Sequence, residues 1–443
     1  MPAILFCMIL IYSDTNTSRL QYICSFIFKE LMGVDFSITD DRKMFSNYVG
    51  AKINYSLVQS PDFSFHIPNE KLLFETGVHQ QNINCFETNG YEAFFKTSHS
   101  DFPFDIFAAS FYLLTRYEEY LPYKKDMYRR YAHENSVAFK EGFLQLPLIN
   151  IWVEDLRESL SEKYSTFNSN YSTFKFVPTY DIDIAYAYQH KGIFRNFGGV
   201  LRSLFSFDIN GFGERVKVLL RNKKDPFDTY DKLDELHKRH KLQPIYFFLV
   251  AKRNTKYDKN ILPNKEAVSQ LIIKQIKKYT IGIHPSWQSG DAIELLKREK
   301  SYLEETCGER ITNTRQHYIR FNLPQGYRRL IDAGLENDYS MGYGSINGFR
   351  ASVASSFYWY DLEREEQTNL RIHPFCYMEA NSYYEQKLSA TEAFEELMHY
   401  YRICKKIGGA LITIWHNHMI GTNKLFKGWG EMYEQFLENV DSE

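Results

Sequence analysis

From residue 174 onward the sequence alternates short apolar segments with segments of helical spacing, and this alternation limits the possible folds more than any other feature. Strands separated by helices pair in parallel through right-handed crossovers, and about seven of them favour a closed or nearly closed barrel over an open sheet. The expected strands are residues 174–180, 245–250, 280–283, 311–316, 348–349, 370–372 and 410–415.

The clearest expected helix precedes the last strand. Ser389 and Glu392 have the spacing of a capping box, and the pair Gly408-Gly409 follows the helix as a terminator. The sequence between them places apolar side chains on one face. This segment therefore predicts a helix that packs directly beside strand 410–415.

The first part of the chain, residues 1–165, predicts a smaller α/β domain without chemistry of its own. The opening run MPAILFCMILIYS is too short to span a bilayer and has neither a basic start nor a cleavage site, so we expect a buried strand. Translation could begin at Met1 or at Met8. A helix capped at Thr17 or Ser18 should end near Gly33.

A second helix of the first domain is expected from a stripe of phenylalanines. Asp101 is the expected cap, Pro103 lies in the first turn, and Phe104, Phe107 and Phe111 share one face. Such a stripe indicates core packing. The Ser-, Asn- and Thr-rich stretch SEKYSTFNSNYSTFKF then predicts the boundary to a second domain over residues 174–443.

Composition excludes several classes of protein. The 53 Lys and Arg against 55 Asp and Glu give a net charge of -2, which argues against a general nucleic-acid surface. The six cysteines form no CxxC pair, so a reducing, cytoplasmic location is expected. The aromatic content of 16% fits either bulky cores or rings that stack on sugars or bases.

Polar residues stand where the expected strands end. The carboxyl ends of barrel strands converge on one mouth, so residues distant in sequence become neighbours around a single pocket. A histidine in such a place can equally be a structural, hydrogen-bonded one. The residues at the strand ends are Asp181, Asp183, His284, His317, Arg350, His373 and His416.

The two aspartates and the histidines suit metal-assisted hydrolysis. A carboxylate with imidazoles can hold a divalent cation such as zinc, which lowers the pKa of bound water to about 7 and polarises a carbonyl oxygen. A second carboxylate can accept a proton from that water, and a histidine can protonate the leaving group. Alternatively, Asp181 or Asp183 caps a following helix.

Three segments resemble motifs of the NodB-homology polysaccharide deacetylases, carbohydrate esterase family four. TYDID resembles the first motif, GIHPSWQS the second and ALITIWHNH the last, in the same order over roughly residues 170 to 440. TYDIDIAY, IGIHPSW, RQHYIRF and NGFRAS also resemble an intracellular bacterial branch with an extra N-terminal domain. The resemblance implies a distorted (β/α)7 barrel that removes N- or O-acetyl groups with a divalent metal.

The family roles, carried over residue by residue, imply that Asp181 is the general base and His416 the general acid. They imply that Asp183 and His284 are metal ligands. The sequence departs from the family at Gln288, where a second metal-binding histidine is usual. We expect His317 to supply the missing nitrogen, which is an inference of our own.

Further residues are expected to bind substrate. Arg315 and Arg350 carry forked guanidinium donors that could orient the base or bind a hydroxyl-rich substrate, although a structural salt bridge is equally compatible. Trp287 could form a wall on which a sugar ring stacks, as could Tyr318, and His418 could support His416. No organic cofactor site is expected.

The sequence thus predicts a metal-dependent carbohydrate deacetylase acting on an acetylated glycan or its precursor, without a membrane span or a nucleic-acid partner. Two alternatives stay open. Asp181-Ile-Asp183 is also the DxD pattern of glycosyltransferases that use nucleotide-sugars. Because Gln288 occupies a ligand position, a non-catalytic glycan-binding relative is possible as well. The oligomeric state and the role of the first domain are left undetermined.

Overall fold

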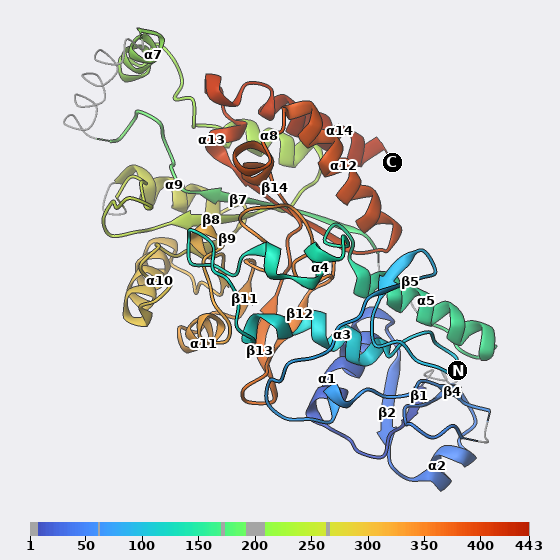
Figure 1. Ribbon diagram of the computed structural model, residues 1–443. Helices are drawn as coiled ribbons and strands as arrows, with labels where there is room; N and C mark the ends of the chain where they lie inside the picture. Colours follow the sequence, from blue (N-terminus) through green and yellow to red (C-terminus); the bar gives the residue numbers. More distant parts are fainter. Residues whose placement is uncertain (1–7, 61–62, 170–172, 192–208, 263–265, 443) are drawn as a thin grey trace, which may run out of the picture.

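The computed structural model describes residues 8–60, 63–169, 173–191, 209–262 and 266–442 (Figure 1). Within them the chain forms one small and one large sheet with helices packed around them, and a two-stranded ribbon of β5 (Phe86–Thr88) and β6 (Tyr91–Ala93). The mixed α/β class expected from the sequence is confirmed.

The small sheet belongs to the first part of the chain. Its order is β2-β1-β3-β4 and every pairing is parallel. The expected opening strand is confirmed as β1, in which Ile9, Leu10 and Ile11 are fully buried; residues 1–7 lie outside the described residues. The strands are β1 (Met8–Tyr12), β2 (Asp35–Thr39), β3 (Lys52–Asn54) and β4 (Phe65–His66).

The helix after β1 begins where the sequence predicts. The Thr17 side chain accepts a hydrogen bond from the backbone N–H of Leu20, and α1 (Ser18–Cys24) continues as a π-helical segment, Ser25–Leu31. Gly33 follows with φ of +65°, a left-handed conformation that glycine adopts without strain.

The cap expected for the second helix is wrong. Asp105, not Asp101, caps α3 (Ile106–Leu114) by accepting from the N–H of Ala108. The chain stays extended through Phe104, which forms a β-bridge with Lys96, so the helix starts later. The remaining helices of this part are α2 (Arg42–Asn47), α4 (Val137–Lys140) and α5 (Leu148–Lys163).

The large sheet contains nine strands in the order β12-β13-β11-β10-β9-β8-β7-β15-β14. All neighbours pair in parallel except β12, which is antiparallel to β13. The strands are β7 (Lys175–Ile182), β8 (Ile245–Leu249), β9 (Thr280–His284), β10 (Asn313–Thr314), β11 (Asn337–Asp338), β12 (Phe357–Asp361), β13 (Glu366–Ile372), β14 (Tyr377–Met378) and β15 (Ala410–His416).

The pairing does not show a closed (β/α)7 barrel. The edge strands β12 and β14 do not pair with each other within the described residues, and the predicted strand 348–349 is absent there. Instead of closing the sheet, β12 folds back on β13. The sheet nevertheless turns strongly: β7 and β8 run across the view of Figure 1, whereas β12 and β13 run nearly vertically.

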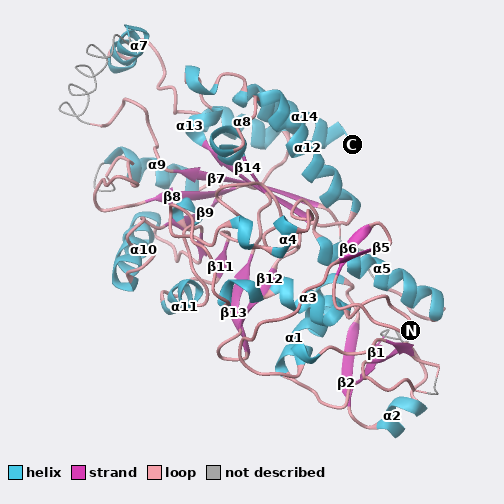
Figure 2. Ribbon diagram, in the orientation of Figure 1, coloured by secondary structure: helices cyan, strands magenta, loops and turns pink. Residues whose placement is uncertain are grey.

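Helices surround the large sheet (Figure 2). The capping box predicted for the helix before β15 is confirmed, because Ser389 accepts from the N–H of Glu392 and Glu392 accepts from the N–H of Ser389. The helices are α7 (Ile209–Leu219), α8 (Tyr230–Arg239), α9 (Glu266–Ile276), α10 (Ile293–Cys307), α11 (Gln325–Asp332), α12 (Ala390–Lys406), α13 (Asn417–Ile420) and α14 (Trp429–Ser442).

Buried contacts join the two parts of the chain. One hydrophobic core cluster contains side chains from both, and Tyr22 of α1 donates a hydrogen bond to the carbonyl of Tyr358 in β12. Arg19 is 1% exposed and pairs with Glu365. The division into 1–165 and 174–443 stays a prediction, and within this structure the two parts share a core.

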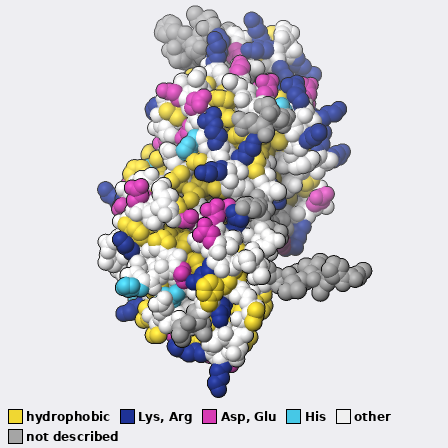
Figure 3. Space-filling view, turned by 90° about the vertical axis from the view of Figure 1, so that its right-hand side faces the viewer, with side chains coloured by type: hydrophobic (Ala, Val, Ile, Leu, Met, Phe, Trp, Pro, Cys, Tyr) yellow, Lys and Arg dark blue, Asp and Glu magenta, His cyan; other side chains and the backbone are white. Residues whose placement is uncertain are grey.

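The face of the molecule in Figure 3 carries acidic and basic side chains interspersed with hydrophobic ones. A field of a single sign, as nucleic-acid binding requires, is not seen on this face. Among the described residues, no helix combines the length and the hydropathy needed to cross a lipid bilayer.

Candidate metal centre

The carboxyl ends of the parallel strands bring five of the predicted site residues around one cavity of about 500 Å³. A parallel sheet places such ends at one edge, which is why residues far apart in sequence meet there. Asp181 lies in β7 and Asp183 just after it, His284 ends β9, His317 follows β10, and His416 ends β15.

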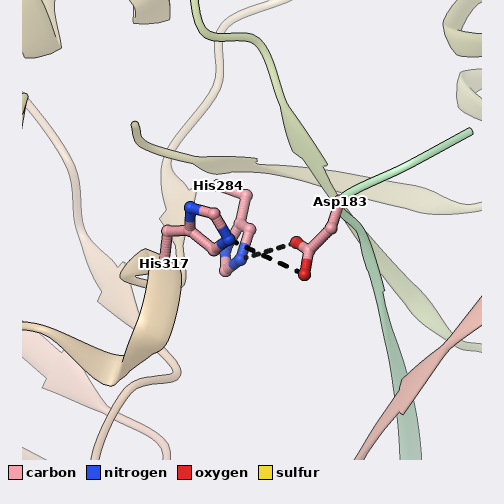
Figure 4. Close-up of side chains that lie close together, drawn as sticks. All are labelled: Asp183, His284 and His317. Atoms are coloured by element: carbon pink, nitrogen blue, oxygen red, sulfur yellow. Dashed lines mark ion pairs between the residues drawn. The ribbon is translucent and has the colours of Figure 1, made fainter. Parts of the chain in front are cut away.

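Asp183, His284 and His317 form a compact group, with one potential ligand atom from each lying within 4.8 Å of the others. Nε2 of His284 is 3.2 Å from Oδ1 of Asp183, and Nε2 of His317 is 3.7 Å from Oδ2. Both imidazole rings point toward the carboxylate (Figure 4). Ligand atoms about 2.0–2.2 Å from a tetrahedral ion stand roughly 3.3–3.6 Å apart, so these spacings suit such an ion.

Each histidine of this group is oriented by a partner at its other ring nitrogen. Nδ1 of His284 is 2.6 Å from the carbonyl oxygen of Arg315, and Nδ1 of His317 is 3.0 Å from Oδ1 of Asp258. An Nδ1–H that donates to these oxygens leaves the Nε2 lone pair facing Asp183. Oδ1 of Asp183 is buried without a hydrogen bond, so the donor set fits a divalent cation.

The charges in the group stabilise one another. Burial alone would raise the pKa of Asp183, but the neighbouring rings of His317 and His284 hold it well below its usual range. Burial alone would lower the pKa of His317, yet the carboxylates of Asp183 and Asp258 raise it to about 9. A positive charge between His317 and the carboxylates is therefore favoured: a proton in the metal-free protein, which a bound divalent cation would displace.

The other two site residues are also held in place. Nη1 of Arg315 donates to Oδ1 of Asp181 at 2.9 Å, and both side chains are almost fully buried. Nδ1 of His416 is 3.0 Å from Oε1 of Glu379, while its Nε2 is 3.6 Å from Oδ2 of Asp183. Although burial opposes it, Glu379 and the two aspartates raise the pKa of His416 to about 10.

The structure does not place Arg315 or Arg350 at the surface of the cavity. Arg315 lies behind Asp181, where it orients the carboxylate, which is one of the two roles that the sequence allowed. Arg350 is 1% exposed, and its guanidinium pairs with Glu119 from the first part of the chain. Its position is that of a structural salt bridge, the other role that the sequence allowed.

Trp287 and His373 also lie differently from the expectation. Trp287 does not line the cavity but stacks at 3.9 Å behind Tyr257, which does. His373 is outside the cavity, because its ring stacks on Tyr339 and both its nitrogens contact side-chain oxygens. Gln288 does not line the cavity either.

His418 lines the cavity, with its ring 5.3 Å from that of His416. Burial and the neighbouring His416 lower the pKa of His418 to about 3, so it is neutral at physiological pH. No hydrogen bond joins the two rings among the described residues, and the expected supporting role stays a prediction.

Sequence reasoning missed Asp258 and Glu379, the carboxylates behind His317 and His416. Asp258 lies in the loop after β8, where no periodic pattern sets it apart. Glu379 directly follows β14, whose two residues are too short for a recognisable strand pattern. A signal was nevertheless present for Glu379: it is an acidic residue inside the apolar stretch FCYMEA.

Comparisons with known proteins found distant similarity only. Residues 9–165 match a family model described as a family of unknown function, DUF7033. The search of curated proteins gave no match.

Three solved structures resemble 61% of this chain. Two are proteins assigned as polysaccharide deacetylases, from Mycobacterium smegmatis (TM-score 0.40) and from Pseudomonas aeruginosa PAO1 (TM-score 0.36); each is 12% identical to this chain and is covered over 85% of its own length. The third is PuuE allantoinase, which is 12% identical, has a TM-score of 0.35 and is covered over 84% of its length. Similarity this distant carries no weight for activity, so the function proposed below rests on the geometry of the site.

Proposed function

We propose that this protein is a metal-dependent carbohydrate deacetylase that hydrolyses an N- or O-acetyl group of a glycan or glycan precursor. One observation supports it above all: the Nε2 atoms of three histidines lie within 3.2–3.7 Å of the Asp183 carboxylate, and the Nδ1 atom of each contacts an oxygen. Histidines that bind a metal characteristically donate their other ring N–H to a carboxylate or carbonyl oxygen, and the Nδ1 atoms of His284 and His317 face such oxygens.

Asp183, His284 and His317 would hold the cation. His317 would serve as the third metal ligand in place of Gln288, because Gln288 lies outside the cavity. A divalent cation such as zinc would polarise the acetyl carbonyl oxygen and lower the pKa of water at the site.

The remaining two residues suit proton transfer. Asp181, fixed by Arg315, would accept a proton from the water that attacks the acetyl carbon. His416 would donate a proton from Nε2 to the departing nitrogen or oxygen of the sugar. Its pKa of about 10 keeps it protonated at neutral pH, and the carboxylate of Glu379 fixes its orientation.

The contacts of Asp181 favour this hydrolase over a DxD glycosyltransferase. In a nucleotide-sugar site the aspartates face a metal-bound diphosphate, whereas one oxygen of Asp181 is occupied by Arg315 and the other is 3.8 Å from His284. A nucleotide-sugar site would also leave the three histidines that face Asp183 without a function. A non-catalytic glycan-binding protein is disfavoured, because the ligand set is completed by His317.

The proposal is tested by acetate release from acetylated glucosamine oligosaccharides and acetyl-xylose esters, with metal content measured on the same samples. Asp181→Asn and His416→Gln should each lower kcat by about 10²- to 10⁴-fold and keep the metal. Asp183→Asn should lose both the metal and the activity. Asp291→Asn is the control, because Asp291 is 60% exposed and lies outside the cavity lining. Acetate release by Asp183→Asn protein at the wild-type rate would refute the proposal.

A further inference from the structure

A loop from the first part of the chain reaches the candidate site of the second. Residues 124–135, called here the Tyr128 loop, carry Tyr128 and Arg130 into the lining of the cavity. Every other lining residue comes from residue 181 onward. The first part therefore completes the cavity wall.

The Tyr128 loop is stiffened by one aspartate. Oδ1 of Asp126 accepts from the backbone N–H groups of Tyr128 and Arg130, at 2.8 and 2.9 Å, and Oδ2 accepts from Nε of Arg130 at 2.6 Å. A β-bridge between Lys125 and Tyr131 closes the loop. The backbone that carries Tyr128 is thus held in place, and the guanidinium of Arg130 lies over the Tyr128 ring at 4.8 Å.

The loop is also anchored to the second part of the chain. Nη1 of Arg130 donates to the carbonyl oxygen of Tyr318 at 2.6 Å, and Nδ1 of His133 is 3.0 Å from Oγ of Ser345. Arg130 fits because residue 344 is glycine: a Cβ there would lie 2.0 Å from Nη1 of Arg130. Tyr318 is the residue next to His317, so the anchor lies beside the candidate metal ligand.

The rings of Tyr128, Tyr257, Trp287 and Tyr318 form an aromatic wall beside the metal centre. Tyr128 lies 5.2 Å from Tyr318 with an angle of 34° between the rings, and 6.1 Å from Trp287. Tyr257 and Tyr318 are 5.6 Å apart, edge to face. Within the described residues the hydroxyls of Tyr128, Tyr257 and Tyr318 have no hydrogen-bond partner.

We infer that the Tyr128 loop carries the Tyr128 ring into the substrate site, where this ring stacks on a sugar unit beside the acetylated one. This inference rests on the proposed function and adds to it the substrate class, an oligosaccharide. A pyranose has an apolar C–H face and a rim of hydroxyls, which match tyrosine rings with free hydroxyls. A cavity of this size also exceeds the needs of an acetyl group.

Trp287 provides a direct readout of binding. The other four tryptophans are at most 3% exposed, whereas Trp287 is partly exposed and stacked on Tyr257. Titration with N,N′,N″-triacetylchitotriose should therefore change the tryptophan emission of the wild-type protein saturably. The same titration of Asp183→Asn protein should give a similar affinity, because sugar binding to the aromatic wall does not require the metal.

The decisive comparison is between substitutions in the loop. Tyr128→Ala should weaken binding of the trisaccharide about tenfold, and Tyr128→Phe, which keeps the ring, by less than about threefold. Met127→Ala is the matched control: Met127 is the adjacent residue, 83% exposed and outside the cavity lining, and its removal should change nothing.

Equal binding by wild-type and Tyr128→Ala proteins would overturn the inference, as would a wild-type protein that does not respond to the trisaccharide. The proposed function fails separately. A wild-type protein that holds no metal and releases no acetate, but still binds the trisaccharide through Tyr128, would refute the proposed hydrolase activity. The same result would support the sugar-binding role of the aromatic wall.

Discussion

At the scale of single residues, the site depends on partners that stand behind the reactive side chains. Asp258, Glu379 and Arg315 contact none of the space a substrate would fill, since none of them lines the cavity. Each one contacts a residue that does: His317, His416 and Asp181 respectively. Their effect is to fix ring orientation and charge, on which the affinity of a metal and the direction of proton transfer depend.

Asp258 offers the sharpest test of this support. Asp258→Asn should weaken zinc binding by about 10- to 100-fold, because the hydrogen bond from Nδ1 of His317 loses its charged acceptor. Competition with a chromophoric chelator measures the affinity. Asp291→Asn is the control, since Asp291 pairs with Arg320 in the same region and is 60% exposed. Unchanged zinc affinity in Asp258→Asn protein would show that Asp258 does not support the site.

At the scale of elements, the strand ends could be predicted and the loops could not. Asp183, His284 and His416 follow apolar runs long enough to be recognised. The expected strand 311–316 shrinks to β10, Asn313–Thr314, because the chain turns away after it: Tyr318 and Ile319 have φ of +59° and +54°. Strands of two residues, such as β11 and β14, leave no periodic pattern, and neither does the loop that carries Asp258.

The packing of α8 on the sheet makes stability depend on pH. His237 of α8 is 2% exposed, and its Nε2 is 2.8 Å from the hydroxyl of Tyr180 in β7. Burial lowers the pKa of His237 from 6.5 to about 4. Above pH 6.5 this histidine is neutral in both states. As the pH falls from 6.5 toward 4, the unfolded chain binds a proton that the folded chain does not, so stability is lost.

Between pH 7 and pH 5 this loss amounts to about 2 kcal/mol for His237. Urea unfolding of the His237→Gln variant should therefore show a smaller decrease of stability over that range than the wild type does. His99→Gln, at an exposed position, should leave the pH dependence as it is. An identical pH dependence in wild-type and His237→Gln proteins would contradict the assignment.

At the scale of the whole molecule, a buried ionic cluster holds the two parts of the chain together. Glu119 from the first part contacts Arg350 of the second and Arg116 of its own part, each at 2.8 Å. All three side chains are at most 3% exposed. The contact between Glu119 and Arg350 joins residues 231 positions apart, so the sequence alone could not decide between substrate binding and a salt bridge for Arg350, or assign a role to the first part.

Removing Glu119 should destabilise both parts at once. Glu119→Gln leaves the buried guanidinium of Arg350 without a compensating carboxylate, whereas Arg116 keeps its pair with Glu118, so we expect a loss of about 3–5 kcal/mol in urea unfolding. Glu363→Gln breaks a pair with Arg328 in which Glu363 is 48% exposed, and should change stability by less than about 1 kcal/mol. A Glu119→Gln protein as stable as the Glu363→Gln control would refute this account of the interface.

The central claim is that His317 completes a metal site that the sequence left incomplete. The direct measurement is metal stoichiometry by elemental mass spectrometry on protein loaded with zinc and then freed of excess ion. We predict one zinc per chain in the wild type and in Gln288→Ala, and a large loss in His317→Ala that matches the loss in His284→Ala. A wild-type protein without zinc, or full occupancy in His317→Ala protein, would contradict the account.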